Sequence, residues 1–416
     1  MSENMQSSEL LNKEQSNQLD YILSAKAVRE SAQKILKLCE RGEGEFIIHR
    51  EKLNEVSDFV ISVIKEKYPD LKIPYHSRYN HFSVGGINRL AALKEKIKDE
   101  EAIERARILI DLVVTSVLLD AGAGNEWKYL ESENHIYSRS EGLAVASYNM
   151  FVKGIFSSDR NLPLRADGPG LVHITEAHIN EGFQVTVGNP LAGAKGRAEL
   201  LHRLGKTIEL NKKIFYGGKL TRPGHIVDYF LAKWPSKKIE ATFILKTVLE
   251  GLGGIWPGRI IFNDVNLGDT WIHPKLGEGF DSFVPFHKLS QWMTYSLLEP
   301  LEEIGFEILN LNLLTGLAEY RNGGLILDTG LIEAKQNLNG KMHHPDSKMV
   351  IEWRGLTVAL LDELAVLIQK KLKLTPAQFP LAKVLEGGTW WAGRKKAQEL
   401  RGGKPPFEMM SDGTVF

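Results

Sequence analysis

The amino-acid sequence predicts a mainly helical fold with a few short strands. Apolar residues recur at helical spacing, as at Val28, Ile35 and Leu38. Strand-like segments are few and short, at residues 183–187 and 259–262. Because the chain has no repeat, heptad run or long linker, we expect one helical unit over residues 21–416. Two lobes divided near residue 206 remain an open alternative.

The helices follow from apolar periodicity and from their start and stop signals. The helix predicted at residues 103–119 is a long apolar segment that stops at a glycine cluster, Gly122 and Gly124. The last begins with Thr375-Pro376, a capping residue followed by proline at the first helical position. The predicted helices, in chain order, span residues 28–38, 56–64, 103–119, 194–204, 239–249, 286–304, 351–372 and 376–385.

Composition narrows the class of protein. The chain has 416 residues, 43% hydrophobic and 25% charged, which is typical of a globular protein. Its 52 basic and 52 acidic residues give zero net charge. Proteins that bind polynucleotides usually carry a basic excess, because neutralising phosphates drives their affinity. We therefore expect a small-molecule partner, a nucleotide or nucleoside, and no polynucleotide.

The apolar stretches, the N-terminal residues and the cysteine content indicate where in the cell the protein is expected. No stretch of about 18 uncharged apolar residues occurs, so no membrane partner is expected. Residues 1–20 form a polar lead-in without an apolar signal core, which predicts disorder there and a cytoplasmic protein. The single cysteine, Cys39, excludes an internal disulfide and any multi-cysteine metal site.

The strongest functional signal lies in two segments, 314–330 and 350–364. The first places Glu319, Arg321 and Asp328 around a Gly-Gly turn, and the second places Glu352 and Arg354 at the head of an apolar helix. Charged groups so close to apolar sequence are costly to bury unless they pair or take part in chemistry. Both explanations stay open, and structural ion pairs are the alternative to an active site.

Three further segments could contribute to a site. Asp120 follows an apolar helix and could orient a hydroxyl group or water, unless it only ends the helix. The turn 188–197 could hold a phosphate with Lys195 and Arg197.

Lys288 could face a pocket together with His273 and His287, although no metal-ligand spacing accompanies them. Ser138 or Ser140 could cap a helix that begins near Arg139.

The C-terminal region is unusually aromatic. Trp390 could stack on a planar base while Arg394 meets a phosphate, and plain packing is the alternative. The last residues, 411–416, end in an apolar phenylalanine, which suggests a tail that packs back on the body.

Four segments together resemble the uracil-catabolism family of fungi and bacteria. They are Tyr79-Asn-His-Phe-Ser-Val-Gly-Gly-Ile87, Arg139-Ser-Glu-Gly-Leu-Ala-Val-Ala146, Glu319-Tyr-Arg-Asn-Gly-Gly324 and Ser411-Asp-Gly-Thr-Val-Phe416. More distantly, Leu317-Ala-Glu-Tyr-Arg321 and Val350-Ile-Glu-Trp-Arg-Gly355 resemble segments of the queuosine-phosphate nucleosidases. That likeness implies a helical, DNA-glycosylase-like fold of the helix-hairpin-helix type. It also implies a catalytic carboxylate at Glu319, where that family has aspartate.

The resemblance implies an N-glycosidase that acts on a ribosylated pyrimidine-breakdown product, such as ribosylurea or its phosphate. Glu319 would stabilise the positive charge that builds on the sugar, with Asp328 as a candidate second carboxylate. Arg321, Glu352 and Arg354 would orient Glu319 or hold a sugar phosphate. No metal or organic cofactor is implied. A non-catalytic nucleotide-binding protein of the same pathway is the rival hypothesis.

Overall fold

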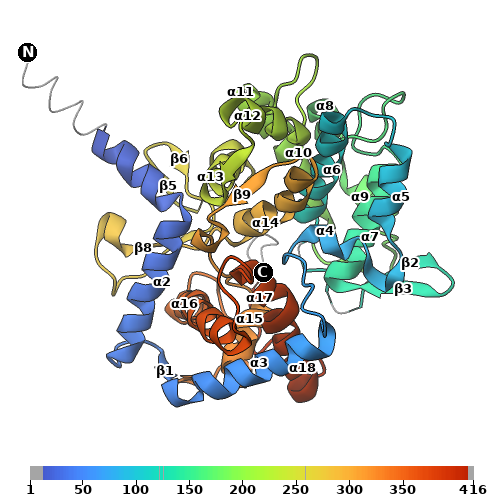
Figure 1. The fold of residues 1–416 in the computed structure, drawn as a ribbon. Helices are drawn as coiled ribbons and strands as arrows, with labels where there is room; N and C mark the ends of the chain where they lie inside the picture. The colour runs from blue at the N-terminus through green and yellow to red at the C-terminus, as the bar shows by residue number, and fades with distance from the viewer. Residues whose placement is uncertain (1–12, 121, 125, 258, 411–416) are drawn as a thin grey trace, which may run out of the picture.

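The computed structural model describes residues 13–120, 122–124, 126–257 and 259–410, and they form a mainly helical protein (Figure 1). Residues 13–22 are helical. The helices that follow are α2 (Ala25–Glu40), α3 (Leu53–Lys67), α4 (Arg78–His81), α5 (Arg89–Lys96), α6 (Ala102–Leu118), α7 (Arg139–Val152), α8 (Gly168–Val172), α9 (Glu176–Gly182), α10 (Ala194–Leu210), α11 (Lys212–Phe215), α12 (Ile226–Lys233), α13 (Ala241–Leu252), α14 (Lys288–Glu303), α15 (Tyr320–Asp328), α16 (Lys348–Leu372), α17 (Leu381–Val384) and α18 (Trp390–Arg401).

The strands form small two-stranded sheets. The antiparallel pairs are β1 (Phe46–Ile48) with β10 (Ile332–Ala334), β2 (Lys128–Ser132) with β3 (His135–Ser138), β5 (Ile261–Phe262) with β6 (Val265–Asn266), and β7 (Thr270–Ile272) with β8 (Phe283–Pro285). The parallel pair is β4 (Lys238–Glu240) with β9 (Glu307–Leu309). Short 3-10 turns and one π-helical turn, Leu385–Thr389, connect other elements.

Helix α16 organises the C-terminal part of the fold. Its 25 residues begin after Ser347, whose hydroxyl accepts the N–H of Val350, and end at Lys373 in a left-handed conformation. The N-terminal helices α2 and α3 pack against it, as does α15, so segments far apart in the sequence lie side by side (Figure 1). One hydrophobic core cluster runs from Ala25 to Phe407.

Helix α14 organises the other side of the core. It packs against α6, α13 and α4, and its first residue is Lys288. Residue 206 lies inside α10. The two-lobe division predicted near that residue would therefore have to pass through a helix.

The predicted helices exist in the structure, with corrections at two N-termini. Residues 238–240 form strand β4, so the helix expected from residue 239 begins at Ala241. Thr375 caps only a single turn by accepting the N–H of Gln378 at 3.3 Å. Proline lacks the N–H that a continuous helix needs, so α17 begins only after Pro380.

The predicted strand at 183–187 is wrong. Gln184 adopts a left-handed backbone conformation with φ of 56°, which turns the chain. Its side-chain amide, and not a backbone ladder, bonds the N–H and carbonyl of Leu130 at 2.9 and 2.8 Å. The strand predicted at 259–262 is confirmed only over Ile261–Phe262.

The polar lead-in was predicted to be disordered over residues 1–20, of which 1–12 lie outside the described residues. The rest is helical, which corrects that part of the prediction. Asp20 bonds Lys246 at 2.9 Å, and the carbonyl of Ile22 pairs with the ring of His287 at 2.8 Å. These contacts fix the segment on the body of the protein.

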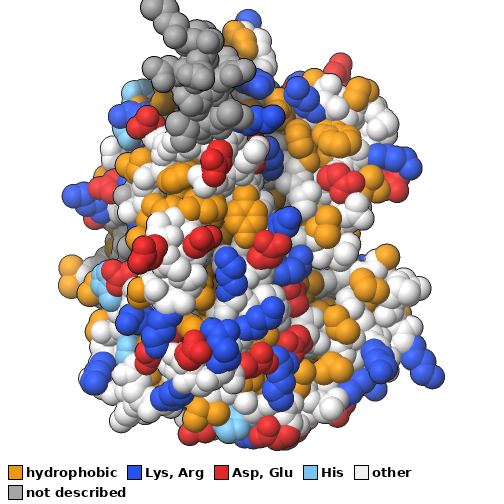
Figure 2. All heavy atoms as spheres, turned by 90° about the vertical axis from the view of Figure 1, so that its left-hand side faces the viewer, with side chains coloured by type: hydrophobic (Ala, Val, Ile, Leu, Met, Phe, Trp, Pro, Cys, Tyr) orange, Lys and Arg blue, Asp and Glu red, His pale blue; other side chains and the backbone are white. Residues whose placement is uncertain are grey.

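Acidic and basic side chains are mixed on the face that carries α2 (Figure 2). Arg50 lies between Glu40 and Glu363, and Arg29 pairs with Asp362 at 2.7 Å. This face therefore presents no continuous basic track. Within the described part of the chain, no helix is both long and apolar enough to cross a bilayer.

Candidate functional site

Glu319 is a buried carboxylate that begins helix α15. It occupies the N-cap position and is 7% exposed. Its two oxygens accept the backbone N–H groups of Arg321 and Asn322, both at 2.6 Å. A carboxylate at this position satisfies free N–H groups and interacts favourably with the positive end of the helix. The carboxylate is consequently held in one orientation.

Asp120 supplies a second carboxylate, at the end of α6. It accepts hydrogen bonds from the Ser140 hydroxyl at 2.7 and 2.9 Å and pairs with Arg78 at 3.0 Å. Burial raises the pKa of Asp120, and Arg78 and Ser140 oppose that rise. Ser140 therefore binds Asp120 and does not cap α7, which corrects one sequence expectation. Ser138 occupies the N-cap position without a side-chain bond.

The charges of both carboxylates affect the pKa of Lys288. Burial lowers the pKa of its ammonium group, and the charges of Glu319 and Asp120 oppose that fall. The pKa of Tyr320 is raised by burial and is affected by Glu319 and Asp120 too. These four residues, Asp120, Lys288, Glu319 and Tyr320, are the central cluster. Among the sequence-predicted residues, Glu319 and Asp120 thus both act electrostatically on Lys288.

Aromatic rings lie beside the cluster. The ring of His81 lies 6.4 Å from that of Trp390, and its Nδ1 lies 3.4 Å from the Ser140 hydroxyl. Burial and the charge of Arg78 lower the pKa of His81 to about 3, so its ring is neutral near pH 7. Trp390 is therefore placed near the residue that binds Asp120.

Arg394 is also close to the ring of Trp390. Its guanidinium carbon lies 5.4 Å from the Trp390 ring centre, and the group pairs with Glu141. Burial tends to raise the pKa of Glu141, but the neighbouring groups, Arg394 foremost, together lower it. Arg394 consequently has an internal partner.

The π-helical turn that precedes α18 carries Glu386, which the sequence did not point to. Its carboxylate pairs with His76 at 2.8 Å, and the His76 ring lies 6.0 Å from Trp390. Single π-helical turns occur frequently at functional sites. Glu386 and His76 thereby help to hold the tryptophan beside His81.

Arg354 is held by an acidic partner. It forms two parallel bonds with Asp269, at 2.8 and 2.7 Å, and its Nε donates to the carbonyl of Ala318 at 3.3 Å. Burial alone would raise the pKa of Asp269, but Arg354 holds it well below its usual range. Asp269 also accepts the indole N–H of Trp271 and the backbone N–H of Lys288. Arg354 thus braces the segments that carry Glu319 and Lys288.

Glu352 lies in the protein core, where it is fully buried. One oxygen pairs with His273 at 3.1 Å, and the other accepts the N–H of Glu45 and lies 3.5 Å from Cys39. Burial raises the pKa of the Cys39 thiol to about 12, so the thiol stays protonated and unreactive. These contacts give Glu352 a structural role away from the cluster.

Arg321 and Asp328 also have internal partners. Arg321 donates to the Gly403 carbonyl at 3.1 Å and lies over the ring of Tyr320. Asp328 binds Arg401 through two bonds, at 2.8 and 2.6 Å. It is nine positions from Glu319 along one helix, about 13.5 Å at 1.5 Å per residue. Paired glycosidase carboxylates lie about 5–9.5 Å apart, so the structure does not bring these two together.

Arg197 was predicted to assist phosphate binding, and it binds backbone carbonyls instead. It is buried and donates to Leu119 at 3.0 Å, to Gly122 at 3.2 Å and to Ala192. Gly193, with φ of 73°, begins helix α10 beside it. The turn therefore anchors the loop that follows α6, and its arginine has no free donor face toward a ligand.

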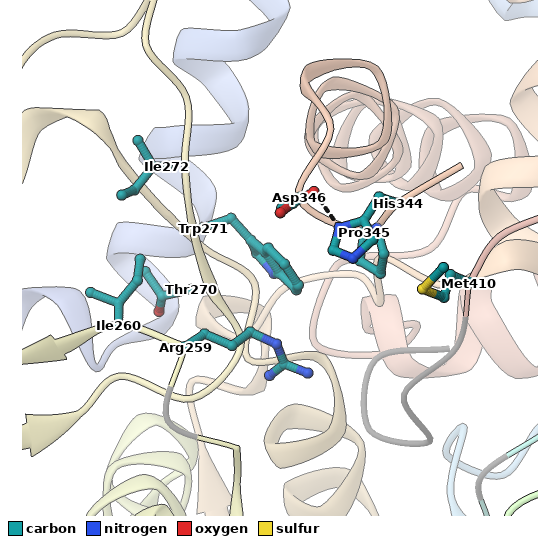
Figure 3. Close-up of a pocket in the computed structure, with 9 residues that line it drawn as sticks. All are labelled: Arg259, Ile260, Thr270, Trp271, Ile272, His344, Pro345, Asp346 and Met410. Carbon is teal, nitrogen blue, oxygen red and sulfur yellow. Dashed lines mark hydrogen bonds and ion pairs between the residues drawn. The ribbon is translucent and has the colours of Figure 1, made fainter. Parts of the chain in front are cut away.

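A pocket with a volume of about 440 Å³ opens elsewhere, between β7 and the loop before α16 (Figure 3). Arg259 stacks over Trp271 at 4.9 Å on one side, and the His344–Asp346 pair lies on the other. None of the sequence-predicted site residues lines it. The indole N–H of Trp271 donates to Asp269, which also binds Arg354. The wall of the pocket is therefore linked to Arg354.

The sequence did not single out several residues of the site region, among them Arg78, His81, Arg139, Asp269, Tyr320 and Glu386. Arg78 and His81 stand in or next to the first family-like segment, and Arg139 begins the second. Those segments were the available signal. Asp269 had none, since an isolated aspartate after a glycine resembles a turn. The predicted tail contact, at residues 411–416, lies outside the described residues.

Comparison with known proteins shows the family. Residues 21–416 match the family described as a protein of unknown function, DUF1688, and the chain belongs to it. Uracil catabolism protein 4 of Lachancea kluyveri is 38% identical over an alignment 442 residues long, gaps included, which covers 96% of this chain and 99% of that protein. Protein urg3 of Schizosaccharomyces pombe is 39% identical over 407 residues, with 95% and 98% covered. The family resemblance seen in the sequence is confirmed.

Proposed function

We propose that the protein acts in uracil catabolism, in the cytoplasm, as an N-glycosidase on a ribosylated pyrimidine-breakdown product such as ribosylurea or its phosphate. The name of the relative from Lachancea kluyveri supports the pathway. The placement of Glu319 carries the proposed chemistry, because this buried carboxylate is held in one orientation and its charge, like that of Asp120, acts on Lys288 and Tyr320. A DNA-glycosylase-like arrangement of the helices belongs to the same proposal.

Breaking a ribose C–N bond builds positive charge on the sugar. A carboxylate fixed beside that carbon stabilises the charge without reorganising during the reaction. Glu319 takes this role, since two backbone N–H bonds fix its direction. Asp120 replaces Asp328 as the proposed second carboxylate, where it could orient the attacking water. The substrate is a small nucleotide or nucleoside, and the reaction needs no cofactor.

The test separates chemistry from helix capping with two matched variants. Asparagine and aspartate both cap helices well, but only aspartate keeps the charge. Glu319→Asn should therefore lose turnover by at least about 10²-fold relative to Glu319→Asp, the scale of one lost electrostatic stabiliser. Release of urea, together with ribose from ribosylurea or ribose 5-phosphate from its phosphate, measures turnover. The exposed Glu333→Gln, at 65% side-chain exposure, is the wild-type-like control. Equal turnover in the two Glu319 variants would refute the catalytic role.

One observation favours the rival, a non-catalytic nucleotide-binding protein. Both oxygens of Glu319 already cap α15, so helix capping alone accounts for the residue. In that case the wild-type protein binds the ligand and returns it unchanged. Equilibrium binding followed by chromatography of the recovered ligand distinguishes the two functions.

A further inference from the structure

Most cations around the central cluster already have partners. Arg78 pairs with Asp120, Arg354 with Asp269, and Arg394 with Glu141. Arg321 donates to the carbonyl of Gly403. These arginines, including the ones expected from the sequence to hold a phosphate, are committed to the protein itself.

Two half-buried cations differ from them. Across the described ranges, neither the ammonium group of Lys288 nor the guanidinium group of Arg139 makes a hydrogen bond or an ion pair. Lys288 is influenced by the charges of Glu319 and Asp120 without a direct bond to either. Withdrawing a cation from water without a direct partner is unfavourable, which indicates that an anion completes the site.

Both cations belong to the edge of the cluster. Arg139 directly precedes Ser140, which binds Asp120. A β-carbon built on Gly403 would lie 3.2 Å from both terminal nitrogens of Arg139, so its guanidinium group lies against that glycine. The same Gly403 carbonyl accepts Arg321, whose guanidinium group covers Tyr320.

Lys288 approaches the cluster from α14. Its backbone N–H is bonded at 3.0 Å to Asp269, which holds Arg354. Arg354 in turn donates to the carbonyl of Ala318, the residue before Glu319. Lys288 is therefore fixed next to the start of α15, and Arg139 next to the residue that binds Asp120.

The backbone is unusual at both positions. Arg139 has φ of 54°, and His287, which precedes Lys288, has φ of 48°. Residues other than glycine rarely adopt this left-handed region, and such strained residues cluster at ligand-binding sites. The His287 ring is fixed by the carbonyl of Ile22 at 2.8 Å, directly before Lys288 in the chain.

We propose that Lys288 and Arg139 together bind a phosphate monoester on the substrate of the central cluster. Lysine supplies a point charge and arginine a fork of donors, a combination suited to a phosphate group. Resting on the proposed function, this makes the substrate a ribosyl phosphate, with its glycosidic carbon at Glu319 and its ester at the two cations. The uncharged nucleoside is the poorer ligand.

The experiment measures binding without turnover, by isothermal titration of the full chain with ribose 5-phosphate, ribose and inorganic phosphate. Lys288→Met and Arg139→Gln should each weaken ribose 5-phosphate binding by about tenfold or more, the scale of a lost charge-assisted bond. Lys288→Arg and Arg139→Lys should restore most of it. Ribose should bind equally weakly to all variants. The exposed Lys212→Met serves as the control, and melting temperatures verify folding.

Each outcome decides the inference. Equal losses for ribose and ribose 5-phosphate, or an equal loss in Lys212→Met, would overturn it. Binding of inorganic phosphate alone, without tighter binding of the ester, would also overturn it as a substrate site. If ribose 5-phosphate binds as expected while ribosylurea phosphate is never cleaved, the anion site stands and the N-glycosidase proposal fails.

Discussion

Asp269→Asn should destabilise the protein substantially, because Asp269 is the internal counter-ion of Arg354. The arginine is 1% exposed and the aspartate 12%, and two bonds of 2.8 and 2.7 Å join them. Removing one partner of a buried pair costs about 3–5 kcal/mol, since the other charge stays buried. Trp271 and the backbone of Lys288 would also bond to a weaker acceptor.

The expected change in melting temperature follows from chain length. At about 2.1 cal/mol/K per residue, the unfolding entropy of 416 residues is near 0.9 kcal/mol/K. A loss of about 3–5 kcal/mol therefore lowers the melting temperature by roughly 3–6 °C. Thermal unfolding followed by circular dichroism measures it. The matched control is Asp346→Asn, whose partner His344 is exposed and whose loss should shift the transition by about 1 °C or less.

The stability contributed by Asp269 should depend on pH in a defined direction. The pKa of Asp269 in the folded protein is held below its usual value. Its stabilisation is consequently present above the ordinary aspartate pKa of about 3.9 and is lost as the pH falls toward the lower folded value. The difference between wild type and Asp269→Asn should shrink below pH of about 4. Equal melting temperatures for the Asp269 and Asp346 variants near pH 7 would refute the reasoning.

Three more perturbations test neighbouring features. Asp328→Asn should lower the melting temperature yet keep turnover per folded molecule, since its carboxylate pairs with Arg401; loss of turnover without loss of stability would restore a catalytic role. Phe407→Ala should cost about 3–5 kcal/mol in unfolding experiments, against about 0.5 kcal/mol for the exposed Leu400→Ala, and similar costs would contradict burial of this segment. Burial raises the pKa of Glu299 to about 8 from 4.5, so wild type should lose stability relative to Glu299→Gln as the pH rises across that interval; a constant difference would contradict it.

The sequence could predict elements whose signal is local. The periodicity of residues 351–372 is carried by one helix, and α16 covers that segment. The strand at 183–187 failed because a glutamine side chain replaces a backbone ladder there, a contact with Leu130 that no local pattern encodes. The last helix was predicted to begin at residue 376, but α17 begins only after Pro380.

Charged residues were located well by the sequence, but their partners were not. Glu319 and Lys288 were singled out, and both lie in the central cluster. Arg354 was expected to orient Glu319 or to hold a substrate phosphate, but its partner Asp269, 85 positions earlier in the chain, was not foreseen. Arginine next to apolar sequence looks the same whether its anion belongs to the protein or to a ligand. Only the fold decides which, because pairing depends on distances between segments that are remote in sequence.

Arg197 joins two loops in a way that constrains how this chain can vary. Its guanidinium group bridges Leu119 and Gly122 to Ala192, and the N–H of Ala192 bonds Ala123 at 3.2 Å. Lysine has all its donors on one nitrogen and lacks the planar fork with which arginine reaches carbonyls on both loops. An insertion in either loop would have to leave these carbonyls in place to keep the bridge. The position of Asp120 is thereby set by a loop that lies about seventy residues away in the sequence.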